Sequence, residues 1–585
     1  MSKFVTISIL AAALNAAAAE TTTVFRAGDS GYASIRIPAL LTAQDGTLLA
    51  FAEGREVARD QAANDIVLRR STDGGRTWLP LQKLADFGKD ALNNPCPVLD
   101  VRTGRLTLFF QRYPSSVHEY GKMEADCVSS NTVRSLLMTS DDHGATWSAP
   151  RDLTCEVKRP SGVTTLASGP GFGIQLQRGP HAGRLVIPFN EGPAGRWRVY
   201  AAYSDDGGAT WRYGDVPAGS LVTNVQGKVE SQVNEVQLIE RADGSLLLNT
   251  RSQTGARQRR QAVSTDGGAT WGPVRLVPEL FDAPCMASIL ALDAGRLLVF
   301  SGPTQGRRAD GRLFLSHDGG DTWEPGATLQ PGPFAYSCLT ELKGGALGCL
   351  FETGEAGCYE RIDFARFDRA WATTVVKRIR VACIGDSITY GAGITNRARD
   401  SYPAVLQRLL GDGYEVRNFG HNGRTVLRDA VNGDNRGYVN QSAYREAVAF
   451  RPDVVVCNLG INDISDFAWN LFPADTQQTN AFATSFVRDY AEILAGFTRG
   501  AAKPQLVIWS PLCPLFEGQC YFSSSRYGAI QSALRAVARV TGAKEVDAYT
   551  LFTPAERGAA FFPDKLHPNA AGAERLAERV AAALK

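Results

Sequence analysis

The stretch Ser71-Thr72-Asp73-Gly74-Gly75-Arg76-Thr77-Trp78 occurs four more times in nearly the same letters. The other copies are SDDHGATW at 140–147, SDDGGATW at 204–211, STDGGATW at 264–271 and SHDGGDTW at 316–323. Successive copies begin 52 to 69 residues apart, so the repeating unit is longer than a hairpin and shorter than a domain. This spacing is typical of the blades of a β-propeller.

Each copy is predicted to be a tight turn that ends one strand and begins the next. The aspartate can accept hydrogen bonds from nearby backbone N–H groups, the glycines supply positive φ angles, and Thr and Trp resume the strand. Five equivalent turns on separate blades do not converge on one substrate. We therefore expect the motif to be structural and the catalytic residues to lie elsewhere.

The chain has 585 residues, and the repeats extend only to about residue 367, so two globular domains are expected. Its hydrophobic content of 44% and charged content of 21% are those of a soluble folded protein. The net charge of +2 gives no electrostatic support to binding of nucleic acid or of an acidic membrane surface. We therefore expect no nucleic-acid partner.

The N-terminus has the pattern of a secretory signal. Lys3 is followed by the apolar run 5–14 and by small residues that end at Ala19. The run is too short to span a bilayer. We expect cleavage after Ala19, a secreted or periplasmic protein and no transmembrane segment in the mature chain; a disordered or membrane-retained N-terminus is the alternative.

The cysteines give no metal-ligand spacing, and no metal or cofactor is predicted. There are 11 of them, and an odd number cannot all pair within one chain. Cys513 and Cys520 share one loop-like segment and are the predicted disulfide. Cys383 and Cys457 lie inside apolar runs and are predicted to be buried thiols.

An arginine stands in an otherwise apolar strand pattern near the start of the chain, in Ser34-Ile35-Arg36-Ile37-Pro38-Ala39-Leu40. An arginine in such a place usually needs a partner. Phe51-Ala52-Glu53-Gly54-Arg55 then leads through 59–65 into the first repeat. Over about residues 24–367 the chain resembles the sialidase (neuraminidase) superfamily, whose hallmark is Arg-Ile-Pro followed by Asp-box repeats on a six-bladed propeller.

The resemblance implies a triad of arginines that binds the substrate. The matching positions are Arg36, Arg251 in Leu248-Asn249-Thr250-Arg251-Ser252, and Arg308, which stands next to Arg307. Sialic acid carries a carboxylate on its anomeric carbon, and planar guanidinium groups bind carboxylates through two parallel hydrogen bonds.

The resemblance also implies the catalytic groups. Asp60 matches the general acid/base, Tyr336 the nucleophile, Glu235 the partner of the nucleophile, and Glu352 the acid that steadies Arg36. A carboxylate nucleophile would be repelled by the substrate carboxylate, whereas a neutral phenol would not. Because a phenol has a pKa near ~10, it needs a base, and Glu235 is the candidate. We therefore expect hydrolysis with retention of configuration.

Further residues are predicted to lie around this pocket. Glu53 and Arg55 are expected to line it, and Asn93-Asn94-Pro95 and the segment 112–132 are expected to form its rim.

From Ile379 onward the pattern changes to apolar strands that alternate with amphipathic helices. The predicted strands are Ile379–Ile384, Tyr414–Phe419, Val454–Leu459, Leu506–Ser510 and Glu545–Asp547, and the predicted helices include Tyr402–Leu410, Ala481–Thr498, Tyr527–Thr541 and Ala570–Leu584. This alternation predicts a parallel, flavodoxin-like α/β/α sandwich. In such sheets ligands bind at the carboxyl ends of the strands.

Four sequence blocks lie at these strand ends or just before the last helix. They are Gly385-Asp386-Ser387-Ile388, Gly420-His421-Asn422-Gly423, Gly460-Ile461-Asn462-Asp463 and Asp564-Lys565-Leu566-His567-Pro568. In this order they resemble the SGNH (GDSL) hydrolase superfamily, over about residues 379–585. The letters around Ser387 and the segment 400–403 resemble those of carbohydrate O-acetylesterases.

The resemblance implies Ser387 as nucleophile, His567 as general base and Asp564 as the residue that orients it. The backbone N–H groups of Ser387 and Gly423 and the side chain of Asn462 would stabilise the oxyanion.

The expected organisation is a signal peptide at 1–19, a six-bladed β-propeller at 20–368, a linker at 369–378 and an SGNH hydrolase at 379–585. We expect a bifunctional enzyme that removes terminal sialic acids and O-acetyl groups, with sialylated and O-acetylated glycans or glycoproteins as partners. Two alternatives remain open: a sialic-acid-binding propeller that delivers an esterase, and a glycosidase for a related keto-acid sugar.

Overall fold

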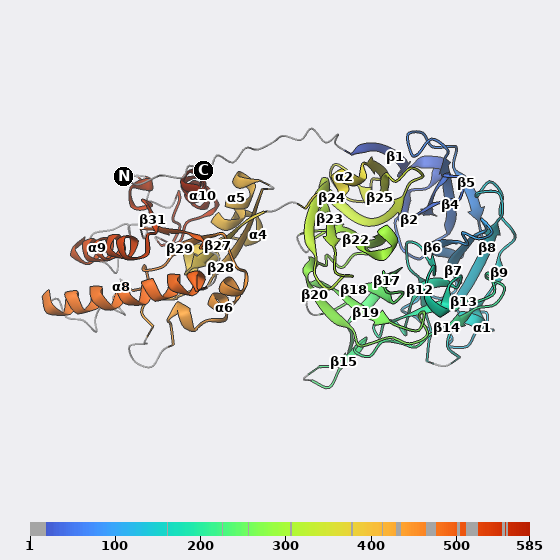
Figure 1. Ribbon diagram of the computed structural model, residues 1–585, viewed down its shortest axis with the longest axis horizontal. Coiled ribbons are helices and arrows are strands. Elements are labelled where there is room, and N and C mark those ends of the chain that lie inside the picture. Colours follow the sequence, from blue (N-terminus) through green and yellow to red (C-terminus); the bar gives the residue numbers. More distant parts are fainter. Residues whose placement is uncertain are drawn as a thin grey trace. The chain divides into compact units, whose positions relative to one another are not determined.

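The computed structural model divides the chain into two compact units, Met1–Val376 and Lys377–Lys585, and each is described by itself (Figure 1). The structure describes residues 19–160, 162–224, 226–254, 257–304, 307–375, 378–411, 413–428, 435–463, 476–499, 503–510, 524–552, 556, 560–564 and 566–584. The predicted signal segment up to residue 18 and the predicted Cys513–Cys520 disulfide lie outside the described residues.

The first unit is built from β-strands that pair almost entirely antiparallel. The largest sheet holds, in spatial order, β2 (Ser34–Thr42), β3 (Leu48–Arg55), β4 (Asn64–Ser71), β6 (Ala91–Leu99), β7 (Leu106–Tyr113), β8 (Arg134–Ser140) and β9 (Arg151–Asp152), with β5 (Gln82–Ala85) paired to β4. Next in size is the sheet of β1 (Glu20–Arg26), β26 (Arg361–Phe367), β25 (Leu347–Thr353), β24 (Glu324–Glu341), β23 (Ala309–Ser316), β22 (Leu297–Pro303) and β21 (Ser288–Leu292).

Three smaller sheets complete the described part of this unit. They are β17 (Val233–Glu240), β18 (Leu246–Ser252), β19 (Gln258–Ser264) and β20 (Arg275–Phe281); β10 (Leu166–Ser168), β11 (Ile174–Gln175), β12 (Leu185–Glu191), β13 (Arg198–Ser204) and β14 (Arg212–Tyr213); and β15 (Leu221–Thr223) with β16 (Val229–Ser231). Short helical segments are η1 (Asp29–Gly31), α1 (Thr154–Val157), η2 (Gly179–His181), η3 (Asp293–Gly295) and α2 (Arg369–Ala372). The prediction that this region is all-β is confirmed.

The five repeated turns have the structure that their sequence predicts. Each begins at the serine that ends a strand, namely β4, β8, β13, β19 and β23. In the first, Asp73 accepts hydrogen bonds from Ser71 Oγ at 2.8 Å, Thr77 N at 3.0 Å and Thr77 Oγ1 at 2.6 Å. Gly74 and Gly75 have φ of 73° and 89°. These bonds, led by that from the Thr77 hydroxyl, lower the pKa of Asp73 to about 2.

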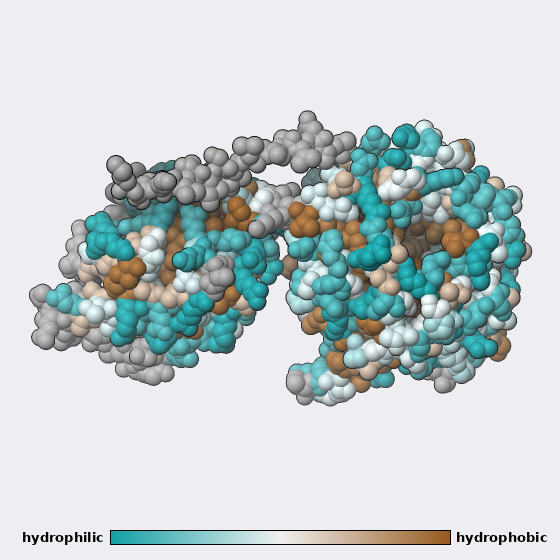
Figure 2. Space-filling model, viewed as in Figure 1, coloured by the Kyte–Doolittle hydropathy of each residue, from teal (hydrophilic) through white to brown (hydrophobic). Residues whose placement is uncertain are grey.

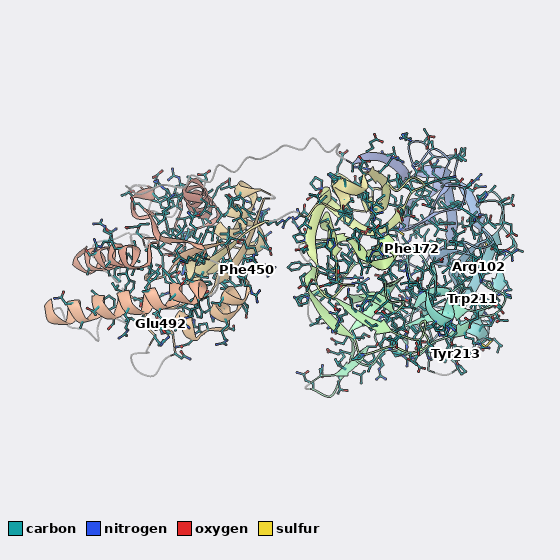
Figure 3. The ribbon with its side chains drawn as sticks, in the orientation of Figure 1. Arg102, Phe172, Trp211, Tyr213, Phe450 and Glu492 are labelled. Atoms are coloured by element: carbon teal, nitrogen blue, oxygen red, sulfur yellow. A yellow bond between two sulfur atoms is a disulfide. The ribbon has the colours of Figure 1, made fainter. Side chains whose placement is uncertain are left out.

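Strands from several sheets approach one another in the middle of the first unit. A cavity of about 240 Å³ is lined by Leu40 of β2, Leu99 of β6, Phe172, Leu290 of β21 and Leu339 of β24. Phe172 lies well inside the unit in Figure 3. The chain closes on itself, because the N-terminal strand β1 pairs antiparallel with β26 near the end of the unit. These contacts bring residues that are far apart in the sequence close together in the middle of the first unit.

The second unit is an α/β unit with a parallel sheet. Its strands lie in the order β28 (Tyr414–Gly420), β27 (Ile379–Gly385), β29 (Val454–Asn458), β30 (Gln505–Trp509) and β31 (Lys544–Val546). The described helices are α3 (Ser387–Tyr390), α4 (Arg397–Asp400), α5 (Tyr402–Leu410), α6 (Ser442–Ala449), α8 (Thr476–Thr498), α9 (Ser524–Thr541) and α10 (Ala570–Leu584). Each predicted strand is present within one residue at either end.

Helices cover both faces of this sheet because alternate strand residues point to opposite sides. Ala382 and Ile384 of β27 belong to a buried cluster with residues of α6, α8 and α9. Val381 and Cys383 of the same strand belong to a second cluster with residues of α5 and α10. Phe450, which follows α6, belongs to the first cluster (Figure 3). Cys383 and Cys457 are buried free thiols, as predicted.

Hydrophilic residues cover most of the visible face of each unit (Figure 2). Of the helices that the structure describes, none combines the length and the apolar character needed to cross a membrane.

Candidate active sites

Glu352 of β25 fixes the first arginine by contacts on both of its carboxylate oxygens. It accepts hydrogen bonds from Arg36 Nε at 2.9 Å and Arg36 Nη2 at 3.0 Å, and also from the backbone N–H groups of Ile37 at 3.0 Å and Tyr336 at 3.3 Å. Ile37 has a φ of 61°, in a region that β-branched residues rarely adopt, and lies in a register shift of β2 against β3. One buried carboxylate thus positions an arginine and two strands.

Tyr336, Glu235 and Arg251 form a hydrogen-bonded group. The Tyr336 hydroxyl donates to Glu235 Oε1, and Arg251 Nη1 donates to Glu235 Oε2 at 2.8 Å and to the Tyr336 hydroxyl at 3.3 Å. Tyr336 is 5% exposed. Burial, and next the charge of Glu235, raise the pKa of Tyr336 well above its ordinary value against the opposing effect of Arg251 and Arg308. The phenol therefore stays protonated until a base removes its proton.

The third arginine also lies close to the tyrosine ring. The Arg308 guanidinium carbon is 5.2 Å from the centre of the Tyr336 ring, and that of Arg36 is 5.3 Å from it. Arg308 Nη2 donates to the carbonyl of Pro284 at 2.7 Å. The neighbouring Arg307 has a side chain 67% exposed and pairs instead with Asp310 at 3.4 Å. Of these two arginines, the structure brings Arg308 to the tyrosine.

Asp60 lies at the exposed end of a chain of charged groups. The buried Arg55 donates to Glu53 through Nε at 2.9 Å and Nη2 at 2.6 Å, and to Asp60 through Nη1 at 2.8 Å. The side chains of Arg55 and Asp60 are 2% and 76% exposed. Desolvation raises the pKa of Asp60, but the field of Arg55, together with those of Arg36 and Arg308, lowers it below its ordinary value.

Both of the predicted rim segments contact residues at or next to the Glu53, Arg55 and Asp60 group. Asn93 Nδ2 donates to the Asp60 carbonyl at 3.0 Å, and Asn94 N donates to Glu53 Oε1 at 2.8 Å. In the segment 112–132, Glu119 N donates to Gln61 Oε1 at 2.9 Å.

The sequence reasoning missed Glu119 and Tyr359. Burial, followed by the charges of Asp60 and Glu235, raises the pKa of Glu119 to about 7. The Tyr359 hydroxyl accepts a hydrogen bond from Arg308, and its ring centre lies 3.9 Å from the Arg36 guanidinium carbon. The only sequence signal for these residues was an acidic or aromatic side chain in an irregular segment.

A disulfide also went unpredicted. Cys127, in the rim segment, is bonded to Cys155 of α1. Beside it, the buried Lys158 donates through Nζ to the carbonyls of Glu124 at 3.1 Å and Asp126 at 2.6 Å. Desolvation lowers the pKa of Lys158 to about 8. These contacts hold the far end of the segment that carries Glu119.

The second unit holds a serine, a histidine and an aspartate in hydrogen-bond contact. Ser387 begins α3 directly after β27, and its Oγ is 2.9 Å from His567 Nε2. His567 Nδ1 is 2.6 Å from Asp564 Oδ2. The other oxygen of Asp564 accepts from the backbone N–H groups of Leu566 at 3.0 Å and His567 at 2.7 Å. Although partial burial opposes it, these contacts with His567 and Leu566 lower the pKa of Asp564.

The predicted oxyanion residues lie on neighbouring loops. Gly423 has a φ of 70°, and Asn462 Nδ2 donates to the carbonyl of the next residue, Arg424, at 2.9 Å. Two buried acids support these loops. Asp386 accepts from Ile388 N at 3.0 Å at the start of α3, and Asp463 accepts from Val426 N at 2.9 Å. Burial raises the pKa of Asp386 to about 7 and that of Asp463 to about 6.

Within the described residues, no three His, Cys, Asp or Glu side chains gather in an arrangement that could hold a metal ion.

Comparison with known proteins assigns a family to each unit. Residues 46–349 match the BNR repeat-like domain, and residues 383–575 match the GDSL-like Lipase/Acylhydrolase family. A sialidase of Micromonospora viridifaciens is 33% identical over 401 residues, which cover 65% of this chain and 59% of that protein. Sialidase-3 of Mus musculus is 32% identical over 419 residues, which cover 59% of this chain and 94% of the relative.

One known relative matches the second unit, and one solved structure of another protein resembles the first unit. An acetylxylan esterase of Xylanibacter ruminicola is 36% identical over 217 residues, which cover 35% of this chain and 43% of that protein. The solved Hadza microbial sialidase Hz136 superimposes with a TM-score of 0.52 at 27% identity, over 60% of this chain and 68% of that one. The chain spans less than two thirds of the Micromonospora sialidase. It belongs to the sialidases with a BNR repeat-like domain, and carries after that domain a second one of the GDSL-like lipase/acylhydrolase family.

Proposed function

We propose that the first unit is an exo-α-sialidase that acts with retention, with Tyr336 as nucleophile, Glu235 as its base and Asp60 as general acid/base. The observation that carries the proposal is the hydrogen-bonded group of Tyr336, Glu235 and Arg251, with Arg36 and Arg308 beside the same phenol ring. Three guanidinium groups beside a neutral nucleophile suit a sugar that carries a carboxylate at the reacting carbon.

The first half of the reaction transfers the sugar to the enzyme. Asp60 donates its proton to the glycosidic oxygen as the bond to the anomeric carbon breaks, and the Tyr336 oxygen attacks that carbon while Glu235 takes the phenol proton. The carboxylate of the substrate offsets the charge of Arg36 and Arg308. Because these arginines lower the pKa of Asp60, substrate binding would raise it and favour the protonated acid.

The second half returns the enzyme to its starting state. A water molecule attacks the anomeric carbon and gives a proton to the Asp60 carboxylate, while the bond to Tyr336 breaks and the phenolate recovers its proton from Glu235. Two displacements at one carbon leave its configuration unchanged.

The test is turnover of a fluorogenic sialoside by Tyr336→Phe, with Tyr213→Phe as control because Tyr213 lies on β14 outside the pocket. We expect Tyr336→Phe to lose nearly all turnover and the control to keep it. NMR of the first product should show the α-anomer. Full turnover by Tyr336→Phe, or a β-anomer as first product, would overturn the mechanism. Binding of sialosides without any release by the unaltered protein would favour a sugar-binding module.

We propose that the second unit is an esterase that removes O-acetyl groups from sialic acid or from the parent glycan. The distances of 2.9 Å from His567 to Ser387 and 2.6 Å from His567 to Asp564 carry this proposal. His567 would take the Ser387 proton as the serine attacks the ester carbonyl, and Ser387 N, Gly423 N and Asn462 would bind the oxyanion. An acetyl ester replaces a hydroxyl donor and adds bulk, so its removal could restore fit to a polar sialidase pocket.

Release of acetate from O-acetylated sialoglycoprotein tests this second activity. Ser387→Ala should abolish it, and Ser442→Ala, at the exposed start of α6, should not. Activity on acetylated xylan but on no acetylated sialic acid would exclude the proposed substrate and leave the sialidase untouched.

We also propose that the first unit is a six-bladed propeller, the second flavodoxin-like, and the protein exported after cleavage at Ala19. The Cys127–Cys155 disulfide supports export, since such bonds persist in oxidising compartments. The N-terminal residue of the mature protein, read by mass spectrometry after secretion, tests the cleavage site.

A further inference from the structure

Another cavity, with a polar lining, lies in the first unit, where strand β1 meets the first Asp-box turn. Its volume is about 310 Å³, and its lining includes Arg26, Arg69, Arg76 and Trp78. Trp78 Nε1 donates to Thr22 Oγ1 at 3.2 Å, and this hydroxyl donates to the Gly75 carbonyl at 3.0 Å, so strand and turn are joined at its base. None of the proposed catalytic residues lines it.

Arg76 is not needed for the turn in which it stands. The equivalent position in the other four copies of the motif is Ala145, Ala209, Ala269 and Asp321. Those turns have the same serine, aspartate and threonine hydrogen bonds as the first. The exposed Arg76 donates through Nη1 to the Asp73 carbonyl of its own turn at 2.9 Å, but the other four copies form the same turn without an arginine at this position.

The described lining is cationic. Asp29 of η1 is its single carboxylate, against three guanidinium groups. It accepts Arg26 N at 3.0 Å and lies 3.6 Å from Arg69 Nη2. Arg69 Nη1 donates to the Leu79 carbonyl at 3.2 Å, whereas Arg69 Nε is buried and has no hydrogen-bond partner in the described structure. Arg69 is thus held at the cavity by Asp29 and by the Leu79 carbonyl.

We propose that this cavity is an accessory site for an anionic group carried by a sugar, either the carboxylate of a further sialic acid or a sulfate ester. Guanidinium groups bind such oxyanions through charge-assisted hydrogen bonds, and Trp78 and the hydroxyl of Thr77 offer an apolar edge and a polar contact to the attached ring. A second contact on the same glycan raises the local concentration of substrate at the enzyme. This site goes beyond the proposed catalytic function and does not require it.

The test is ¹⁹F NMR of protein that carries 5-fluorotryptophan, with the Trp78 signal assigned by Trp78→Phe. We expect this signal to move on titration with sialic acid or with glucose 6-sulfate, and not with glucose. Movement by only one of the two acidic sugars identifies the source of the anion. Inorganic sulfate that moves the signal as strongly as either sugar would show an adventitious ion only, and no movement by either sugar would equally overturn the proposal.

The variant R26A/R76A should weaken this binding by roughly tenfold or more, because two charged hydrogen-bond donors are removed. Arg212→Ala is the matched control, since Arg212 is an exposed arginine that directly follows another copy of the motif. Both variants should keep the kcat/KM of a small fluorogenic sialoside, so a failed sialidase assay and a failed accessory site are distinguishable. Unchanged binding by R26A/R76A in a folded protein would contradict the site.

Discussion

The two candidate active sites are assembled in opposite ways. In the second unit, Asp564 and His567 lie three residues apart on one turn, and a single long-range contact, across 180 positions, brings Ser387 to His567. In the first unit, the Arg36–Glu352 contact joins residues 316 positions apart, and the Tyr336–Glu235 contact joins residues 101 apart. We call the site of the second unit local, because it depends on the tautomer of His567. We call the site of the first unit distributed, because it depends on how whole strands pack against one another.

The largest expected effect is that of Asp564→Asn on the esterase. The asparagine oxygen can keep the backbone bonds of Leu566 and His567, which places its NH₂ group against His567 Nδ1. The ring would then carry its proton on Nε2 and could not act as a base toward Ser387. We expect a loss of kcat of about 10³- to 10⁴-fold, measured as acetate release, with sialidase turnover of the same sample as the internal control. A loss below tenfold would contradict the assigned role.

Glu352→Gln is the corresponding test of the distributed site in the first unit. It would leave Arg36, whose side chain is only 12% exposed, without its carboxylate and weaken the bonds to Ile37 N and Tyr336 N. Loss of one partner of a buried ion pair costs about 3–5 kcal/mol of folding stability, and the misplaced Arg36 should lower sialidase kcat/KM by roughly 10²-fold. Glu341→Gln, in the exposed end of β24, is the control. Equal effects of Glu352→Gln and Glu341→Gln on kcat/KM would show that the contact between Glu352 and Arg36 does not contribute to sialidase turnover.

Glu119→Gln should change a pH profile rather than abolish activity. The pKa of Glu119 is raised to about 7, so the residue is neutral below this pH and gains charge above it. The charge would repel the substrate carboxylate, and we expect the KM of the unaltered protein to rise about three- to tenfold between pH 6 and pH 8. The variant should lack this rise. Glu124→Gln, an exposed residue of the same segment, should retain it.

What could be predicted from the sequence follows the same division. The strand-end blocks of the second unit were visible because a parallel sheet gathers its carboxyl ends, and Ser387 and His567 do meet there. In the first unit the motifs indicated which residues to compare, and the structure brings Arg36, Tyr336 and Glu235 together. It does so at register shifts, such as those beside Ile37 and between Phe334 and Ser337, which no periodicity shows.

Residues that depend on irregular backbone could not be predicted. Glu119 and Tyr359 stand outside the strands, and their positions follow from loop conformation. Cys127 and Cys155 pair across 28 residues without a repeating pattern around them. The Cys513–Cys520 pairing, predicted because the two residues are close in the chain, lies outside the described residues and stays a prediction.

The smallest expected effect concerns the repeated turns, which hold the strands on which the distributed site depends. Asp73→Asn keeps the shape of the side chain and removes its charge, so the bonds from Thr77 and Ser71 become weaker, by roughly 1 kcal/mol. The pKa of Asp73 lies at about 2 in the folded protein and near 3.8 when unperturbed, so its contribution is complete above about pH 4. The contribution is lost as the pH falls toward 2, because the unfolded chain then binds the proton more readily.

The difference in Tm between the variant and the unaltered protein should therefore be present at pH 6 and shrink toward pH 3 and below. Sialidase kcat at 25 °C should change little, since Asp73 contacts no proposed catalytic residue. A loss of kcat as large as that of Glu352→Gln would mean that a single turn positions the pocket. The first unit would then resemble the second, in which one turn holds both Asp564 and His567, and the contrast between a distributed and a local site would fail.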